Sequence, residues 1–196
     1  LDRLDTVRRN GTHTLDVNYD LTGNLTSRSD VGTYTYHASK RHALTAAGSN
    51  SFTYDANGNV ITRNGATLGW ASYDLPTSLV SGSNTASFAY TPERQRWRQV
   101  AETSGVTETT IYVAGLLEKV SKPSLTLWKH YVATPTGTGA VYVRRSDGTS
   151  DTYYLTTDHL GSTDRLVKAA SGTVQVAESF DAFGKRRGSA WTGVPS

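Results

Sequence analysis

Short stretches of alternating polar and apolar residues run along most of the chain, and clusters of turn-forming residues separate them. The clearest stretch is Thr12–Tyr19, in which Leu15, Val17 and Tyr19 alternate with polar residues. A period of two places successive side chains on opposite faces of a β-strand. We therefore predict an all-β fold of short strands, with at most one helical turn, over residues 116–120.

A repeat of about 18 residues is superimposed on this alternation. The pattern Tyr-Asp-x-x-Gly-Asn-aliphatic occurs at 19–25 and again at 54–60, and weaker copies begin at Tyr36, at Tyr73-Asp74 and at Tyr90. The successive intervals between these tyrosines are 17, 18, 19 and 17 residues. Such a period accommodates two short strands and two turns, so each repeat is predicted to be one β-hairpin of a single curved antiparallel sheet.

The repeated motif carries the chemistry of a tight turn. An Asp that opens a turn accepts a hydrogen bond from the backbone N–H two residues later, and a Gly at the fourth position adopts the left-handed conformation. The preceding Tyr can lay its ring over a neighbouring strand. The predicted structural residues are Tyr19, Asp20, Gly23, Asn24, Tyr54, Asp55, Gly58, Asn59, Asp158, His159, Gly161, Asp181 and Gly184.

The composition agrees with a folded sheet and limits the chemistry. Eleven Tyr residues and a net charge of only +3 argue against disorder. The absence of Cys excludes disulfides and thiolate metal sites. No apolar run is long enough to span a bilayer, so no membrane span is expected. Since the chain begins at Leu1 and contains no Met, we expect it to be a segment of a longer protein.

Two groups of residues invite a catalytic or binding interpretation. Asp158, His159 and Ser162 suggest a hydrolase, but neighbouring residues of one turn cannot easily converge on a substrate, so a turn role is favoured. The alternating cations Arg94, Arg96 and Arg98 fit one solvated strand face, and nucleic acid is not expected as a partner. The five His residues lack metal-ligand spacing. We therefore expect no enzyme activity, no metal and no cofactor.

The second half of the chain adds a more specific string, Tyr154-Leu-Thr-Thr-Asp-His-Leu-Gly-Ser-Thr163, followed by Phe180-Asp-Ala-Phe-Gly-Lys-Arg186. Together with the Tyr-Asp repeats, this string resembles the RHS/YD-repeat family. The resemblance implies YD-repeat hairpins over residues 1–110 and RHS core-associated hairpins over residues 111–196. The two would form one continuous sheet, a fragment of a larger YD-repeat β-shell.

Proteins of that family enclose a C-terminal toxin domain in a hollow shell and serve in bacterial competition. The resemblance implies a structural shell segment of a polymorphic toxin, secreted or delivered to the cell surface, with targeting signals outside residues 1–196. Its partners would be flanking repeats of the same protein and an enclosed toxin domain. The isolated segment is expected to self-associate, because its sheet edges would be uncovered.

A carbohydrate- or cell-surface-binding module is the alternative. Exposed aromatic side chains on a sheet can stack on glycans, and the candidates are Trp70, Trp97, Trp128 and Trp191. The hairpin period of the tyrosines favours the structural interpretation.

Overall fold

A computed structural model describes residues 3–135 and 137–187, and all of its regular structure is β-strand. The chain divides into two compact units, Leu1–Ser87 and Phe88–Ser196. The first holds β1 (Thr6–Arg9), β2 (Thr12–Tyr19), β3 (Leu25–Arg28), β4 (Gly32–Tyr36), β5 (Leu44–Ala47), β6 (Asn50–Tyr54), β7 (Val60–Arg63), β8 (Ala66–Trp70) and β9 (Pro76–Ser81). Strand β10 (Asn84–Tyr90) crosses the division.

The second unit continues with longer strands. These are β11 (Arg96–Thr103), β12 (Val106–Val113), β13 (Leu117–Ser121), β14 (Thr126–Thr134), β15 (Gly137–Arg145), β16 (Ser150–Thr157), β17 (Thr163–Lys168), β18 (Val174–Ala177), β19 (Ser179–Phe180) and β20 (Arg186–Arg187). Strand β13 corrects the sequence prediction of a helical turn over 116–120. Its Val120 is buried, and both edges of β13 are hydrogen-bonded to neighbours, so sheet pairing overrides the local preference.

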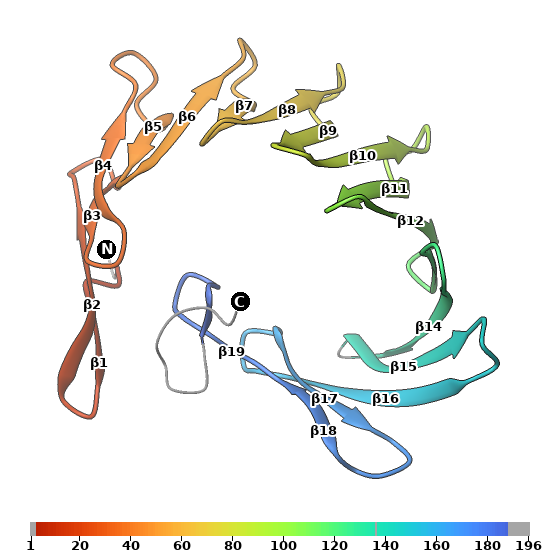
Figure 1. The fold of residues 1–196 in the computed structure, drawn as a ribbon. Helices are drawn as coiled ribbons and strands as arrows, with labels where there is room; N and C mark the ends of the chain where they lie inside the picture. The colour runs from red at the N-terminus through yellow and green to blue at the C-terminus, as the bar shows by residue number, and fades with distance from the viewer. Residues whose placement is uncertain (1–2, 136, 188–196) are drawn as a thin grey trace. The chain divides into compact units, whose positions relative to one another are not determined.

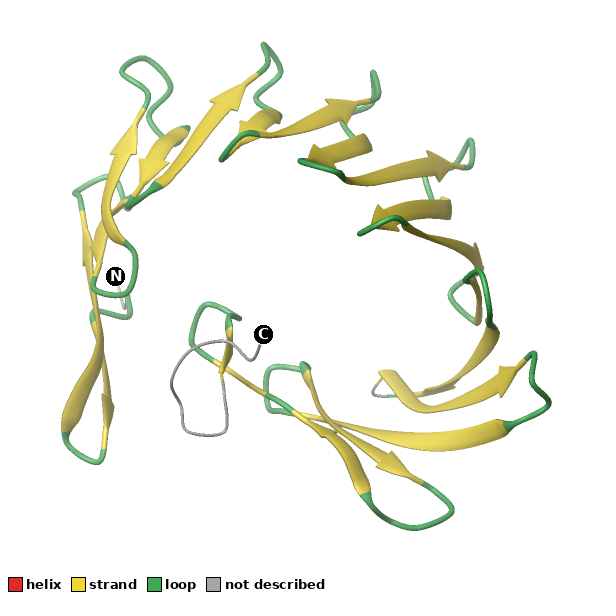
Figure 2. Ribbon diagram, in the orientation of Figure 1, coloured by secondary structure: helices red, strands yellow, loops and turns green. Residues whose placement is uncertain are grey.

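Strands β1 to β18 belong to one antiparallel sheet, and β19 and β20 form a separate two-stranded ladder. In the first unit each strand pairs with the next one in sequence, and in the second β11 to β18 do the same. The sheet of each unit is curved (Figure 1), and only turns and loops link its strands (Figure 2). The predicted all-β fold of repeated antiparallel hairpins in a curved sheet is confirmed.

The first unit has two chemically different faces. On one face, here called the aromatic face, Leu15, Val17 and Ala47 are buried. The register places a set of half-buried rings and aliphatic chains on the same face: Tyr19, Tyr34, Tyr36, Phe52, Tyr54, Leu68, Trp70 and Leu79. The opposite face carries mostly hydroxyl side chains: Ser27, Thr33, Thr35, Ser51, Thr53, Thr62, Thr67 and Ser78.

The second unit also separates its residues by face. Thr110, Val120, Val141 and Val143 are buried and share what is here called the covered face. The covered face also holds ion pairs. Lys129 Nζ lies 3.3 Å from Glu118 Oε2, and Asp151 lies between Arg145 at 2.8 Å and Lys168 at 2.6 Å.

A β-bulge recurs beside the tight turns, in four cases next to the aromatic residue that precedes the turn. The strand register shifts between Asn18 and Tyr19, Thr35 and Tyr36, Thr53 and Tyr54, Gly69 and Trp70, and Thr156 and Thr157. A bulge inserts one extra residue and increases the local bend and twist of the strand. We attribute the curvature of the sheet within each unit in part to this repeated bulge.

Candidate functional site

The Asp-x-x-Gly turns are the most regular feature of the described chain, and all four share one hydrogen-bond pattern. The Asp backbone N–H donates to the carbonyl four residues later, at 2.8–2.9 Å, and the Gly N–H donates to the Asp carbonyl, at 3.0–3.3 Å. This pattern closes a three-residue hairpin loop whose last residue is left-handed. Accordingly, Gly23, Gly58, Gly161 and Gly184 have φ of 96°, 96°, 85° and 78°.

The Asp carboxylate fills the inside of each loop. For Asp20, Asp158 and Asp181, one carboxylate oxygen accepts the backbone N–H two residues later, at 2.8–2.9 Å, as predicted. In all four turns it also accepts the N–H four residues later, again at 2.8–2.9 Å. One side chain therefore holds both ends of the loop.

The same loop is also built without the motif. Ala71–Leu75, Thr91–Gln95 and Arg145–Thr149 make the same two backbone hydrogen bonds. In the first of these, Trp70 and Ala71 occupy the Tyr and Asp positions, and Asp74 takes the Gly position with φ of 60°. The sequence copy placed at Tyr73-Asp74 is therefore wrong by three residues, because Tyr73 lies inside the loop. A left-handed Asp costs less than most other residues, which explains why Asp74 can replace Gly.

Three aromatic residues of the first unit, each at the end of a strand, are anchored on the preceding hairpin. The hydroxyls of Tyr36 and Tyr54 donate to the carbonyls of Leu25 and Leu44, at 2.9 and 2.7 Å. The Trp70 indole N–H donates to Val60 O in the same way, at 2.9 Å. Each acceptor is the first strand residue after the previous turn. Sequence analysis named Trp70 only as a glycan candidate and did not predict its anchoring role. Like Tyr19 and Tyr54, however, Trp70 lies six residues before a strand start.

The turns of the first unit are also bonded to one another. Asn24 Nδ2 donates to the carbonyl of Arg41, at 2.8 Å, and Asn24 Oδ1 lies 2.6 Å from His42 Nδ1. Asn59 Nδ2 donates to Asp74 Oδ1, at 2.8 Å. Each Asn residue therefore links its own turn to another turn that lies about one repeat further along the chain. The sequence did not predict Arg41, His42 and Asp74 as partners of these Asn residues, since no local pattern marks a partner 15–18 residues away.

The carboxylates of Asp20 and Asp55 are stabilised in the ionised form. Hydrogen bonding by Thr22, together with Asn24, lowers the pKa of Asp20. Desolvation acts to raise the pKa of Asp55, but the hydrogen bonds from Asn59 and from the turn backbone outweigh it and lower this pKa. The fold therefore favours the ionised form of Asp20 and Asp55 in these two turns.

The residues that suggested a hydrolase lie together in one tight turn. The Asp158 carboxylate accepts the backbone N–H groups of Leu160 and Ser162, both at 2.9 Å, and His159 is exposed beside it. These contacts favour the predicted turn role for Asp158. Among residues 3–135 and 137–187, no three His, Asp or Glu side chains are grouped as metal ligands would be.

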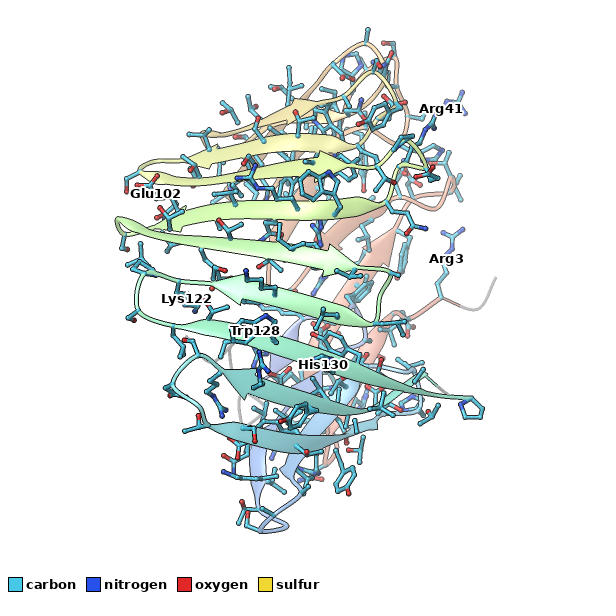
Figure 3. All side chains as sticks on the ribbon, turned by 90° about the vertical axis from the view of Figure 1, so that its right-hand side faces the viewer. Arg3, Arg41, Glu102, Lys122, Trp128 and His130 are labelled. Atoms are coloured by element: carbon cyan, nitrogen blue, oxygen red, sulfur yellow. The ribbon has the colours of Figure 1, made fainter. Side chains whose placement is uncertain are left out.

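The tryptophans of the carbohydrate hypothesis lie in different settings. Trp70 is half-buried on the aromatic face, and Trp97 is 41% exposed. Trp128 lies on β14 near His130 (Figure 3), and the guanidinium carbon of Arg144 lies 4.6 Å from its ring centroid. Trp191 lies outside the described residues.

No protein-family model and no curated protein matches the chain. In the part of the chain that the structure describes, no helix could cross a membrane.

Proposed function

We propose that the chain is a structural shell segment of an RHS-type toxin that encapsulates a C-terminal toxin domain. The observation that carries the proposal is the double link between successive hairpins of the first unit. The hydroxyls of Tyr36 and Tyr54 are anchored on the previous hairpin, and Asn24 and Asn59 bond to the next turn. Such links make a continuous wall from units that would be marginal alone.

The function of such a wall is physical confinement. A hairpin sheet separates the space on its two sides without a catalytic centre, and its curvature allows many repeats to surround a cargo. In the first unit the side chains of Tyr34, Phe52 and Leu68 lie on the aromatic face and are only half-buried. We infer that cargo segments contact this face, where partly exposed apolar side chains can hold a chain that is incompletely folded.

The wall role also accounts for the apparent catalytic cluster. In the proposed function Asp158 and His159 belong to a turn, and the segment needs no cofactor. The enclosed toxin domain would supply the activity, and the parent protein would carry the signals for secretion or delivery to the cell surface. Flanking repeats would cover the two ends of the segment.

Size-exclusion chromatography with light scattering tests the open-wall proposal on the 196-residue chain. Uncovered sheet edges and one apolar face predict concentration-dependent self-association and binding of a hydrophobic dye. Adding the flanking repeats of the parent should suppress both. A monodisperse monomer that unfolds cooperatively and binds no dye would contradict the proposal, because it would have a closed core of its own.

A further inference from the structure

A straight row of side chains crosses the second unit from β11 to β16. The strand register places Arg98 opposite Ile111, Ile111 opposite Lys119, Lys119 opposite Trp128, Trp128 opposite Arg144, and Arg144 opposite Ser150. Directly opposed residues in a sheet project from the same face. These six residues therefore form one line on the face opposite the covered face, here called the basic row.

The charges in the basic row alternate with uncharged side chains. Arg98, Lys119 and Arg144 stand on β11, β13 and β15, which are alternate strands. Since neighbouring strands lie about 4.8 Å apart, the cations recur at roughly 10 Å. Ile111 and Trp128 fill the intervening positions, and both are half-buried. The row therefore offers regularly spaced positive charge with apolar surface between the charges.

Most carboxylates of the second unit near the basic row lie on the covered face, opposite the row. Glu118 and Asp151 are on the covered face, where Lys129, Arg145 and Lys168 neutralise them. Among the described residues, Arg98, Lys119 and Arg144 make no ion pair, and all three are exposed. Glu102 shares their face but lies four residues from Arg98 along β11, near the end of that strand (Figure 3).

The Trp128 ring is held in place by one of these cations. The Arg144 guanidinium lies over the ring at 4.6 Å, a cation–π contact that orients both side chains. His130, two residues along β14 on the same face, packs against Tyr142 with ring centroids 5.9 Å apart. The basic row is therefore flanked by polar aromatic side chains that can donate hydrogen bonds to hydroxyl groups.

We propose that the basic row binds an acidic polysaccharide in which a carboxylated sugar alternates with a neutral one, lying across the strands. Each cation pairs with one carboxylate, and the intervening neutral ring lies over Ile111 or Trp128. The spacing favours this ligand over nucleic acid, whose phosphates recur about every 3.4 Å along each strand of a duplex and call for denser positive charge. This surface is independent of the proposed wall role, since it uses none of the turn or aromatic-face residues.

The test uses the full 196-residue chain and a hyaluronan octasaccharide, which carries one carboxylate per disaccharide. Binding is measured by calorimetry at low salt against two comparison ligands, neutral dextran and single-stranded oligothymidylate. We expect hyaluronan binding that weakens as salt is raised, and weaker or no binding of the other two. The double variant Lys119→Gln/Arg144→Gln should weaken hyaluronan binding roughly five- to tenfold. The matched control Arg41→Gln removes an exposed cation of the first unit and should leave binding unchanged.

Several outcomes would overturn the proposal. It fails if the chain does not bind hyaluronan at about 1 mM, or if Arg41→Gln weakens binding as much as the double variant does. It also fails if oligothymidylate binds more tightly, because the row would then be a nucleic-acid surface. Thermal unfolding of each variant shows that the change in affinity does not arise from a lost fold. Failure here would leave the self-association test of the wall unaffected.

Discussion

Replacement of Gly58 tests whether backbone conformation alone selects Gly in the Asp-x-x-Gly turns. Gly58 has φ of 96°, and a Cβ built on it meets nothing within 4 Å. A larger side chain therefore has space, and the whole cost of Gly58→Val must come from the left-handed backbone. That cost is about 1–2 kcal/mol for an ordinary residue, with a β-branched residue at the upper end.

Two further effects reduce the expected loss of unfolding free energy in Gly58→Val. Replacing Gly lowers the entropy of the unfolded chain, which returns about 0.4–1 kcal/mol. The same loop also accepts L-residues when φ moves toward 60°, since Asp74 and Arg94 hold the equivalent position at 60° and 65°. We expect Gly58→Val to lower the free energy of unfolding by about 1 kcal/mol or more, Gly58→Ala by less, and Gly58→Asn by under about 0.5 kcal/mol.

Urea denaturation at one fixed protein concentration measures this series, with tryptophan fluorescence and circular dichroism as independent probes. The urea midpoint should be highest for Gly58→Asn, lower for Gly58→Ala and lowest for Gly58→Val, with the same dependence of the unfolding free energy on urea concentration in all three. Gly69→Ala is a useful contrast, because its Cβ would lie 2.5 Å from Ser78 Oγ. Truncating Ser78 should rescue Gly69→Ala, whereas no neighbouring truncation should rescue Gly58→Val. Equal stability of the Val and Asn variants would refute the backbone argument.

Three further predictions concern the links around the turns. Because the pKa of Asp55 is lowered in the fold, its contribution is present above the unfolded pKa of about 3.9 and is lost as pH falls through the folded value. The melting temperature of Asp55→Asn should therefore be below that of the native chain at pH 7, and the gap should close toward pH 3; a constant gap would contradict the lowered pKa. Tyr54→Phe removes the bond to Leu44 O and should cost about 0.5–1.5 kcal/mol in urea, while the control Tyr154→Phe, at a ring 55% exposed, should cost little. Equal costs would mean that the anchor does not stabilise the fold. Asn59→Ala should speed amide hydrogen exchange in both the 55–59 and the 71–75 turns, and faster exchange in its own turn alone would show that the bond to Asp74 does not couple them.

The sequence predicted the features that depend on residues a few positions apart, but it did not predict contacts between residues that are distant in sequence. Alternation fixed β2 at Thr12–Tyr19, and the Asp-x-x-Gly spacing correctly gave the left-handed glycines. Both depend on residues a few positions apart. The loop at Ala71–Leu75 was misplaced because it has neither Asp nor Gly at the diagnostic positions, and its geometry is imposed by the pairing of β8 with β9.

The hydrogen bonds between repeats could not be predicted from sequence, because they join residues that are distant in the chain. Asn24 and Asn59 looked like ordinary turn residues, and only the stacking of hairpins brings Arg41 and Asp74 to them. The basic row could not be predicted from sequence either, because Arg98, Lys119 and Arg144 lie on three different strands. Only the register of the intervening strands reveals that they share a line.

The bulge that follows the turns has a consequence for how such a sheet can grow. A strand has a period of two, so one inserted residue would send every later side chain to the wrong side. In the first unit, each bulged hairpin includes the extra residue of its own bulge. The strands of the next hairpin therefore begin with the same alternation of side chains between the two faces. Copying a complete hairpin within a gene would therefore lengthen the protein without reversing its two surfaces, whereas gain or loss of a single codon in a strand would reverse them.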